Sequence, residues 1–337
     1  MLIEVNIPPR EPANNVIQNP FSRLRTPMFI AVLVVLIVML PFRNVIAQEP
    51  LWKGNGRIIV SADGNEHDHD DWAGTPLSLA IIASQKLQDK VPLFIYSDHI
   101  WGSNQEHPGV NGVNPYDQMK ESAVNGGRMF GFTSTRFLCA VDNVEVAYDA
   151  LKSQINESTQ DNPLFIVVAG PVQVIGEALA RAETRPKAHV TVISTKDAWN
   201  NNHADAPYGG WDIHTGWTLD EIKQHSAELK DGLKIVTIRN QNPCLNRRWS
   251  EYDWLRTAPE RNHPYYKEGS WNWLFDRLCM SIKPVSGKEN YYAIDPSDAG
   301  KVIFLLTGIE DTSPQLCYEL MKIPRVNSES RRDSSQP

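Results

Sequence analysis

The stretch from Asp63 to Asp71 gathers side chains that are suited to binding a metal ion. Its carboxylates, amide and histidines are Asp63, Asn65, Glu66, His67, Asp68, His69, Asp70 and Asp71. Carboxylates this close together repel one another unless a cation lies among them, and hard cations prefer oxygen ligands of this kind. A solvated acidic turn is the alternative interpretation.

Short apolar runs alternate with helical patterns on both sides of this stretch. The runs that predict strands are Ile58–Val60, Val91–Tyr96, Leu164–Val168, Val190–Ile193 and Leu233–Ile238. The segments that predict helices are Gly74–Lys86, Tyr116–Val124, Val144–Ile155, Val172–Ala182, Leu219–Leu229 and Lys301–Leu306. Strands separated by helices of about ten to fifteen residues indicate an α/β fold, with a mostly parallel central sheet covered by helices on both faces.

This topology predicts where the polar loops meet. The carboxyl ends of parallel strands lie at one edge of a sheet, and ligands of open α/β sheets bind there. The loop after Val60 should therefore lie beside Asp98 and His99, beside Ala169–Gly170, and beside the loop that follows Ile193. The strand before the acidic stretch thus favours a ligand site over a solvated turn.

The N-terminal segment, residues 1–47, has the pattern of a signal peptide or an N-terminal membrane anchor. Met28–Phe42 is almost wholly apolar, follows Arg23 and Arg25, and is shorter than the ~20 residues that span a bilayer. Val45 and Ala47, at the −3 and −1 positions, fit cleavage after Ala47. We expect an exported protein, periplasmic or extracellular, and a membrane anchor formed by residues 28–42 is the alternative to a cleaved signal. Residues 50–326 should form one α/β domain, and residues 327–337 a disordered tail.

Composition narrows the classes of partner. A net charge of −7 argues against non-specific nucleic-acid binding. Several tryptophans lie in Asn- and Gly-rich segments and are candidates for stacking on a sugar or base: Trp101, Trp199, Trp211 and Trp217. The four cysteines show no CxxC spacing, so a zinc ribbon is not indicated. A Cys244–Cys279 disulfide and buried free thiols both fit the sequence. The oligomeric state is a separate open point.

Two kinds of metal site fit the acidic stretch. His67, His69 and Asp71 are similar to the HxHxDH signature of zinc-dependent metallo-β-lactamase-type hydrolases, with Trp72 in place of the final histidine. That fold is an antiparallel sandwich, which does not suit alternating strands and helices. The other site is a calcium site built from Asp63, Asn65 or Glu66, and Asp71, completed by a later carboxylate and backbone carbonyls.

The calcium interpretation agrees with a family resemblance that covers roughly residues 56–310. D-G-N-E-H-D-H-D-D after Ile58–Val60 resembles the strand, D-x-D-P-G-x-D-D and helix of inosine–uridine-type nucleoside hydrolases, with one residue more and no Pro-Gly pair. LFIVVAGPVQVIGEAL, residues 164–179, resembles that family's strand, Thr-Gly-Pro and helix. D-P-S-D-A-G, residues 295–300, resembles its late His-Asp segment. The chain is similar to secreted nucleoside-hydrolase-like proteins of bacteria.

The resemblance implies a role for each matching residue. It implies Asp70 as the general base that activates the attacking water. The implied metal ligands are Asp63, Asn65, Asp71, the Ala169 backbone carbonyl and Asp298, with Asp295 as the alternative to Asp298. Asn200, Asn201 or Asn202 would hold sugar hydroxyls, and Asp98 and His99 are further candidates for substrate contact. The family's histidine before the late aspartate is Ser297 or Ile294 here.

These residues together predict a calcium-dependent hydrolase of an N-ribosyl or related glycosidic bond. Its substrate would be a small nucleoside or another sugar-containing molecule, with water activated by Asp70. Two alternatives stay open. One is a zinc-dependent hydrolase that uses His67, His69 and Asp71. The other is a calcium-dependent carbohydrate-binding protein without catalytic activity.

Overall fold

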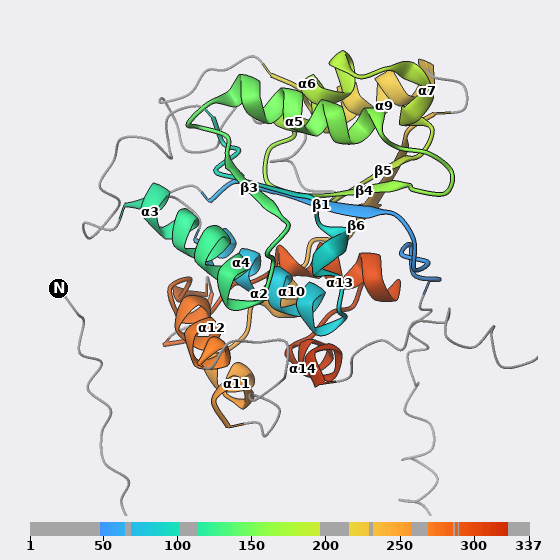
Figure 1. Cartoon of the computed structure of the whole chain (residues 1–337). Coiled ribbons are helices and arrows are strands. Elements are labelled where there is room, and N and C mark those ends of the chain that lie inside the picture. Colours follow the sequence, from blue (N-terminus) through green and yellow to red (C-terminus); the bar gives the residue numbers. More distant parts are fainter. Residues whose placement is uncertain are drawn as a thin grey trace, which may run out of the picture. The chain divides into compact units, whose positions relative to one another are not determined.

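Six parallel strands form the central sheet of the computed structural model (Figure 1). The structure describes residues 48–64, 69–100, 114–195, 216–228, 232–257 and 269–322, except residues 286 and 289. The strands are β1 (Arg57–Ala62), β2 (Leu93–Tyr96), β3 (Arg136–Cys139), β4 (Leu164–Ala169), β5 (Val190–Thr195) and β6 (Lys234–Ile238). They lie in the order β3-β2-β1-β4-β5-β6. The predicted α/β fold with a parallel sheet is therefore confirmed.

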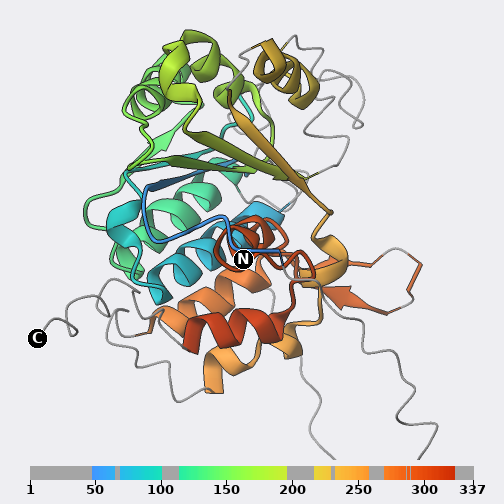
Figure 2. The ribbon, with the colours of Figure 1, turned by 90° about the vertical axis from the view of Figure 1, so that its right-hand side faces the viewer.

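Helices cover both faces of this sheet (Figure 1). One layer contains α5 (Val144–Asn156), α6 (Gln173–Arg181), α7 (Thr184–Lys187) and α9 (Leu219–Glu228). The other contains α2 (Asp70–Ser84), α3 (Pro115–Lys120), α4 (Gly126–Met129), α10 (Asn242–Leu245), α11 (Trp254–Thr257), α12 (Ser270–Cys279), α13 (Ala299–Thr307) and α14 (Pro314–Lys322). Figure 2 shows both layers from the side, with the small β7 (Lys283–Pro284) and β8 (Tyr292–Ala293) hairpin away from the main sheet.

The alternation of side chains along the strands produces two hydrophobic cores. Ile58 and Val60 of β1 belong to the core that α2, α12 and α13 complete, and Ile59 belongs to the core of α5 and α6. Successive residues of a strand point to opposite faces, so a continuous apolar run is what a sheet covered on both sides requires. The strands are therefore short, continuous apolar runs in the sequence, because both of their faces are buried.

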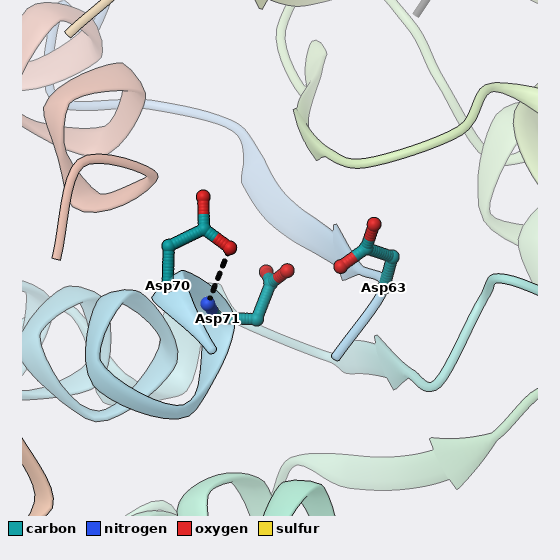
Figure 3. A group of neighbouring side chains, drawn as sticks. All are labelled: Asp63, Asp70 and Asp71. Carbon is teal, nitrogen blue, oxygen red and sulfur yellow. Dashed lines mark hydrogen bonds between the residues drawn. The ribbon is translucent and has the colours of Figure 1, made fainter. Parts of the chain in front are cut away.

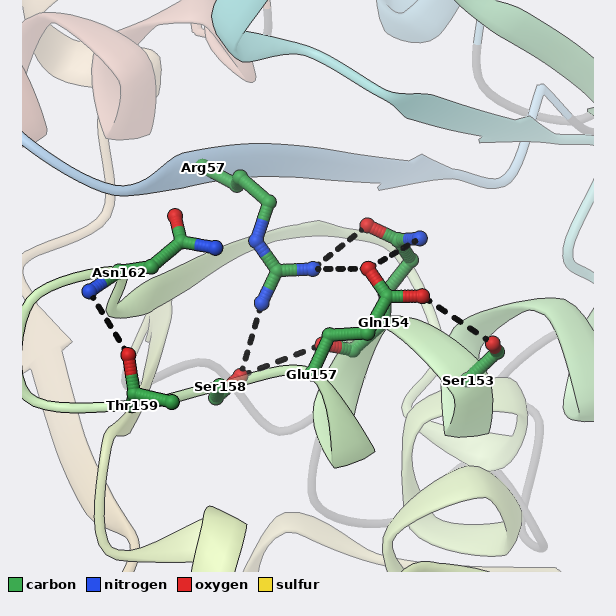
Figure 4. Close-up of polar contacts among 7 residues, drawn as sticks. All are labelled: Arg57, Ser153, Gln154, Glu157, Ser158, Thr159 and Asn162. Atoms are coloured by element: carbon green, nitrogen blue, oxygen red, sulfur yellow. Dashed lines mark hydrogen bonds and ion pairs between the residues drawn. The ribbon is translucent and has the colours of Figure 1, made fainter.

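Arg57 fixes the beginning of β1 (Figure 4). Its guanidinium donates to Gln154 Oε1 at 2.7 Å and to Ser158 Oγ at 3.2 Å, and pairs with Glu157 at 3.3 Å. Burial lowers the pKa of Arg57, and the charge of Glu157 opposes that change. These contacts attach the start of β1 to the end of α5 and the residues that follow it, at the edge of the sheet opposite Asp63.

Several elements were not predicted from the sequence. β3 is a four-residue edge strand in which Arg136 is exposed and Phe137 half-buried, so it lacks the fully apolar pattern of the other strands. The helix at Tyr116 divides into α3 and a π-helical turn, η3 (Glu121–Asn125). The hairpin strands β7 and β8 are two residues each. Such short elements carry little periodicity.

Two features bear on the expectations for export. All four cysteines are free thiols, so Cys244 and Cys279 are not joined. Within the part of the chain that the structure describes, no helix is long and apolar enough to cross a membrane. Residues 28–42 and the tail from residue 327 lie outside that part.

Candidate metal centre

The order of the strands identifies one place on the sheet where a ligand site is expected. After β1 the chain continues to β2 on one side, and after β4 it continues to β5 on the other side. The strand order therefore reverses between β1 and β4. In doubly wound sheets the crevice outside the carboxyl ends of the strands at this point is the usual ligand site. Asp63 follows β1 there, and Gly170 follows β4.

Three carboxylates converge at this switch point. Asp63 follows β1, and Asp70 and Asp71 begin α2; Figure 3 shows their side chains around a common space. One oxygen from each lies within 4.8 Å of the others. Oxygen atoms bound to one Ca²⁺ at 2.3–2.6 Å are at most about 5 Å apart, so one ion could bridge all three. We call these residues the acidic cluster.

Asp71 is the most deeply buried member of the acidic cluster, with 2% of its surface exposed. Its Oδ2 accepts a hydrogen bond from the Gly64 amide at 3.1 Å, whereas its buried Oδ1 receives none from the described residues. Burial raises the pKa of Asp71 well above its ordinary value, and the charges of Asp63 and Asp298 add to the rise. A buried carboxyl oxygen without a donor is costly, and a cation would satisfy it. The donor set consists of oxygens, which fits calcium.

Asp98 lies fully buried at the end of the neighbouring strand β2. Its amide donates to the Ala62 carbonyl at 3.1 Å, and Ser61 Oγ donates to its Oδ2 at 2.5 Å. Its Oδ1 is buried with no donor among the described residues. Burial raises the pKa of Asp98 well above its ordinary value, and the charge of Asp63 adds to this rise. His99 is also buried. Both residues follow the carboxyl end of β2, as predicted, and both side chains are buried from solvent.

Asp298 brings a fifth carboxylate to this region from the other end of the chain. It precedes α13 but makes no capping hydrogen bond to that helix; its carboxylate pairs with Lys301. A Cβ atom on Gly74 of α2 would lie 2.9 Å from the Asp298 Cβ atom, so the start of α13 packs directly on α2. Asp298 is not among the three carboxylates within 4.8 Å, although its charge raises the pKa of both Asp71 and Asp98.

Asp295, the alternative late ligand, is engaged elsewhere. It is fully buried, and its carboxylate binds Lys283 Nζ at 2.9 Å, Asn246 Nδ2 at 3.1 Å and the Ser297 amide at 3.2 Å. These contacts tie the hairpin and the segment before α13 together. Of the two late aspartates, Asp298 is therefore the one whose charge acts on the acidic cluster.

The end of β4 packs closely against Asp63. The Ala169 carbonyl accepts a hydrogen bond from the Asp63 amide at 3.0 Å, which uses one of its two lone pairs. Gly170 has φ +144, and a Cβ atom there would lie 2.6 Å from the Asp63 Cβ atom. Only glycine allows this approach. Ala169 thus lies beside Asp63, as the predicted ligand set requires.

A hydrogen-bond chain from α12 supports the first turn of α2. Pro76 lies inside α2 and has no amide hydrogen to donate to the Trp72 carbonyl four residues earlier. Ser122 Oγ, in the π-helical turn, donates to that carbonyl at 2.7 Å instead. Buried Arg277 donates to Ser122 Oγ at 2.8 Å. This support was not predicted from the sequence, in which the proline inside α2 is the one local signal for it.

The remaining predicted site residues include one that the structure describes, His69, and several that lie outside the described part of the chain. His69 stacks on Trp72 with ring centroids 3.8 Å apart. Asn65, His67, Asn200 and Asn202 lie outside the described residues, as do Trp101, Trp199 and Trp211. Among the described side chains, the group that could hold a metal contains carboxylates only.

A separate cavity of about 490 Å³ lies between α6 and α9. Trp217 lines it and packs against Gly176, and its amide donates to Gln173 Oε1 at 2.7 Å. Gln173 also donates to Tyr148, and Glu221 accepts from Thr218. These polar groups of the cavity are thus used by the fold itself, and no member of the acidic cluster lines it.

The buried carboxyls predict an unusual pH dependence of stability without metal. Asp71 and Asp98 keep their protons in the folded protein at pH values where the unfolded chain, with an ordinary pKa of 3.8, has lost them. The folded state then binds more protons, so its free energy of unfolding should fall as pH rises, by about 1.4 kcal/mol per pH unit for each retained proton. In EDTA, we expect Tm to be higher at pH 5 than at pH 8.

Calcium should remove this fall, because ligands bind metal in the deprotonated form. Asp98→Asn should weaken the pH dependence measured in EDTA, and the exposed Asp149→Asn should not. A metal-free Tm that rises from pH 5 to pH 8 would contradict the assignment.

Fold and site together define a doubly wound α/β protein with a candidate metal centre at its switch point. No protein-family model matches the chain. The uncharacterized protein P22 of Formosa agariphila is 27% identical over 266 residues, which are 78% of this chain and 87% of that protein.

Two solved structures show a more distant likeness. An inosine-uridine preferring nucleoside hydrolase from Bacillus anthracis matches 79% of this chain and 99% of its own, with a TM-score of 0.41 and 11% identity. A plant nucleoside hydrolase matches 74% of this chain and 78% of its own, with a TM-score of 0.35 and 15% identity. TM-scores below 0.5 at this identity establish neither a family nor an activity.

Proposed function

We propose that this protein is a calcium-dependent hydrolase of an N-ribosyl or related glycosidic bond. The observation that carries the proposal is the convergence of Asp63, Asp70 and Asp71 at the switch point, with a buried Asp71 oxygen that has no donor among the described residues. The class of bond rests on the resemblance of three segments, in the same order, to the nucleoside-hydrolase motifs.

Asp63, Asp71, Asp298 and the Ala169 carbonyl are the groups that would hold the ion. A calcium ion bound there would fix two hydroxyls of the sugar and increase the acidity of a water molecule. Asp298 would complete the set from α13, opposite the strand ends. Asn65 belongs to the proposed set through the family resemblance alone.

Asp70 is the proposed general base. It is half-buried, so water can reach it, whereas Asp63 and Asp71 are buried. Its Oδ1 accepts the Asp71 amide at 3.0 Å, which orients the carboxylate. Asp70 would take a proton from water as the water attacks the anomeric carbon and the bond to the leaving group breaks. Proton transfer to a positioned carboxylate contributes typically about 10²–10⁴-fold to a rate.

The residues around the late aspartate suggest which leaving groups the site accepts. Ser297 is buried, and Ile294 lies in the apolar core, so neither supplies the acid that the family's histidine would provide. We therefore propose a substrate whose leaving group departs without a strong proton donor at this position. Asp98 and His99, with Asn200 and Asn202, are the proposed contacts to the sugar.

A chelation experiment with a chromogenic riboside tests this function. 4-Nitrophenyl β-ribofuranoside releases a stable anion and needs no proton donor. We expect hydrolysis that EDTA abolishes and Ca²⁺ restores, with Zn²⁺ ineffective. Restoration by Zn²⁺ alone would favour the zinc hydrolase that uses His67, His69 and Asp71. Calcium binding without turnover of this riboside or of natural nucleosides would favour a carbohydrate-binding protein.

The site of action is a further part of the proposal. Residues 1–47 support export to the periplasm or the extracellular space, with or without a tether formed by residues 28–42. An N-terminal sequence beginning at Gln48 in protein secreted from an expressing cell would show cleavage after Ala47.

A further inference from the structure

Lys301 is a buried lysine beside the proposed metal centre. Only 4% of its surface is exposed, and its ammonium pairs with the Asp298 carboxylate. Lys301 lies one turn into α13, so both partners are positioned by the same helix start. Neither the proposed function nor the family resemblance gives this lysine a role.

The charge of Lys301 also acts on a second carboxylate of the site, Asp98. It opposes the rise in the pKa of Asp98, so the ammonium acts on β2 as well as on its own helix. The carboxylates that share this region are Asp63, Asp70, Asp71, Asp98 and Asp298. Lys301 therefore acts on two carboxylates of this region, Asp98 through its charge and Asp298 through their ion pair.

Asp298 lies outside the acidic cluster and is paired with Lys301. The three carboxyls of the acidic cluster lie within 4.8 Å of one another, and Asp298 does not belong to that group. A calcium ion that takes Asp298 as a ligand must compete with the ammonium for the same carboxylate. The positive charge that remains beside the ion would repel it, and this repulsion grows in proportion to the charge of the ion.

We propose that Lys301 is the internal counter-cation of the metal centre, which neutralises Asp298 when no ion is bound and sets the affinity for the ion. This inference rests on the proposed function. Lys301 is a positioning residue in this account, because it acts on the ion through Asp298. Its presence favours ions of lower charge, since a trivalent ion is repelled more than a divalent one.

The test measures metal binding by calorimetry, with CaCl₂ alone and TbCl₃ alone as titrants. Lys301→Met should bind Ca²⁺ about tenfold more tightly than the natural chain. Coulomb energies scale with charge, so the same variant should bind Tb³⁺ about thirtyfold more tightly. Lys301→Arg, which keeps the charge, should stay within about threefold for both ions.

Lys283→Met is the matched control. Lys283 also pairs with a buried aspartate, Asp295, at 2.9 Å, but that pair lies outside the acidic cluster. The Lys283→Met variant should have a lower Tm, and its affinities for Ca²⁺ and Tb³⁺ should equal those of the natural chain. If Lys301→Met is folded without metal only at low temperature, thermal melts replace calorimetry, and the rise in its Tm on adding Ca²⁺ should exceed the rise for the natural chain.

The outcomes separate this inference from the proposed function. Suppose that the natural chain binds calcium and that Asp71→Asn abolishes this binding. An unchanged or weaker affinity in Lys301→Met would then overturn the role of Lys301 alone. Equal gains for Ca²⁺ and Tb³⁺ also overturn it, because a purely structural change would not depend on ionic charge. Absence of calcium binding in both the natural chain and Lys301→Met overturns the metal centre itself.

Discussion

Replacing Asp70 by Asn is expected to lower kcat on a ribosyl substrate by about 10²–10⁴-fold, the usual contribution of a general base. Calcium affinity should change by less than about threefold, because Asp63 and Asp71 remain. The amide oxygen of Asn can still accept the Asp71 amide hydrogen, as Asp70 Oδ1 does at 3.0 Å. The first turn of α2 should therefore keep its geometry, and the loss should appear in kcat rather than in folding.

For Asp70→Asn, kcat is measured by steady-state kinetics and calcium affinity by calorimetry on the same preparation. Asp149→Asn, an exposed aspartate of α5 on the opposite face of the sheet, is the control and should change neither. Unchanged turnover in Asp70→Asn would remove Asp70 from the mechanism. Unchanged sugar binding in a chain that shows no turnover at all would instead identify a carbohydrate-binding protein.

Replacing Asp71 by Asn should have two opposite effects. We expect calcium affinity to fall by at least about a hundredfold, because the variant loses a buried anionic ligand. We also expect the metal-free protein to become more stable near neutral pH, by about 1–3 kcal/mol, the usual cost of a buried polar group left unsatisfied. Burial raises the pKa of Asp71 well above its ordinary value, so a neutral amide suits this position better in the absence of a cation.

Asp295→Asn provides the contrast for that experiment. Asp295 is buried like Asp71, but Lys283 and Asn246 bind it. The Lys283 side chain is 36% exposed and can be solvated, so the variant loses charge-assisted hydrogen bonds worth about 1.5–3 kcal/mol; it should lose stability by that amount and keep its calcium affinity. Thermal melts in EDTA and calorimetry with CaCl₂ separate the two variants. A destabilised Asp71→Asn protein with unchanged calcium affinity would show that Asp71 serves the fold and not a metal.

Much of the architecture could be predicted because it depends on local patterns. The apolar run at Ile58–Val60 marks β1, and the parallel arrangement follows from strands that alternate with helices. Together they bring the loop after β1 beside Ala169 and Asp98. The observed boundaries of the elements differ from the predicted ones by a few residues. Helix α2, for example, begins at Asp70, whereas the sequence predicted a start at Gly74. That shift places Asp70 and Asp71 in the first turn of a helix.

Other features depend on contacts between distant residues and carry no local signal. The family resemblance favours Asp298 over Asp295, but nothing in the sequence predicts their different partners, Lys301 for Asp298 and Lys283 for Asp295. Lys301 reads as an ordinary polar position near the start of an apolar helix, and its burial follows from the packing of α13. The exposed edge strand β3 was missed because only part of it faces a core.

The most direct test of the metal centre is a crystal structure of the protein soaked in Ca²⁺. We predict one ion, with oxygens of Asp63, Asp71 and Asp298 and the Ala169 carbonyl at 2.3–2.6 Å. Asp298 should then have moved toward the acidic cluster and away from Lys301. An ion bound elsewhere, or an acidic cluster that stays empty at millimolar calcium with Asp298 still paired to Lys301, would contradict the account.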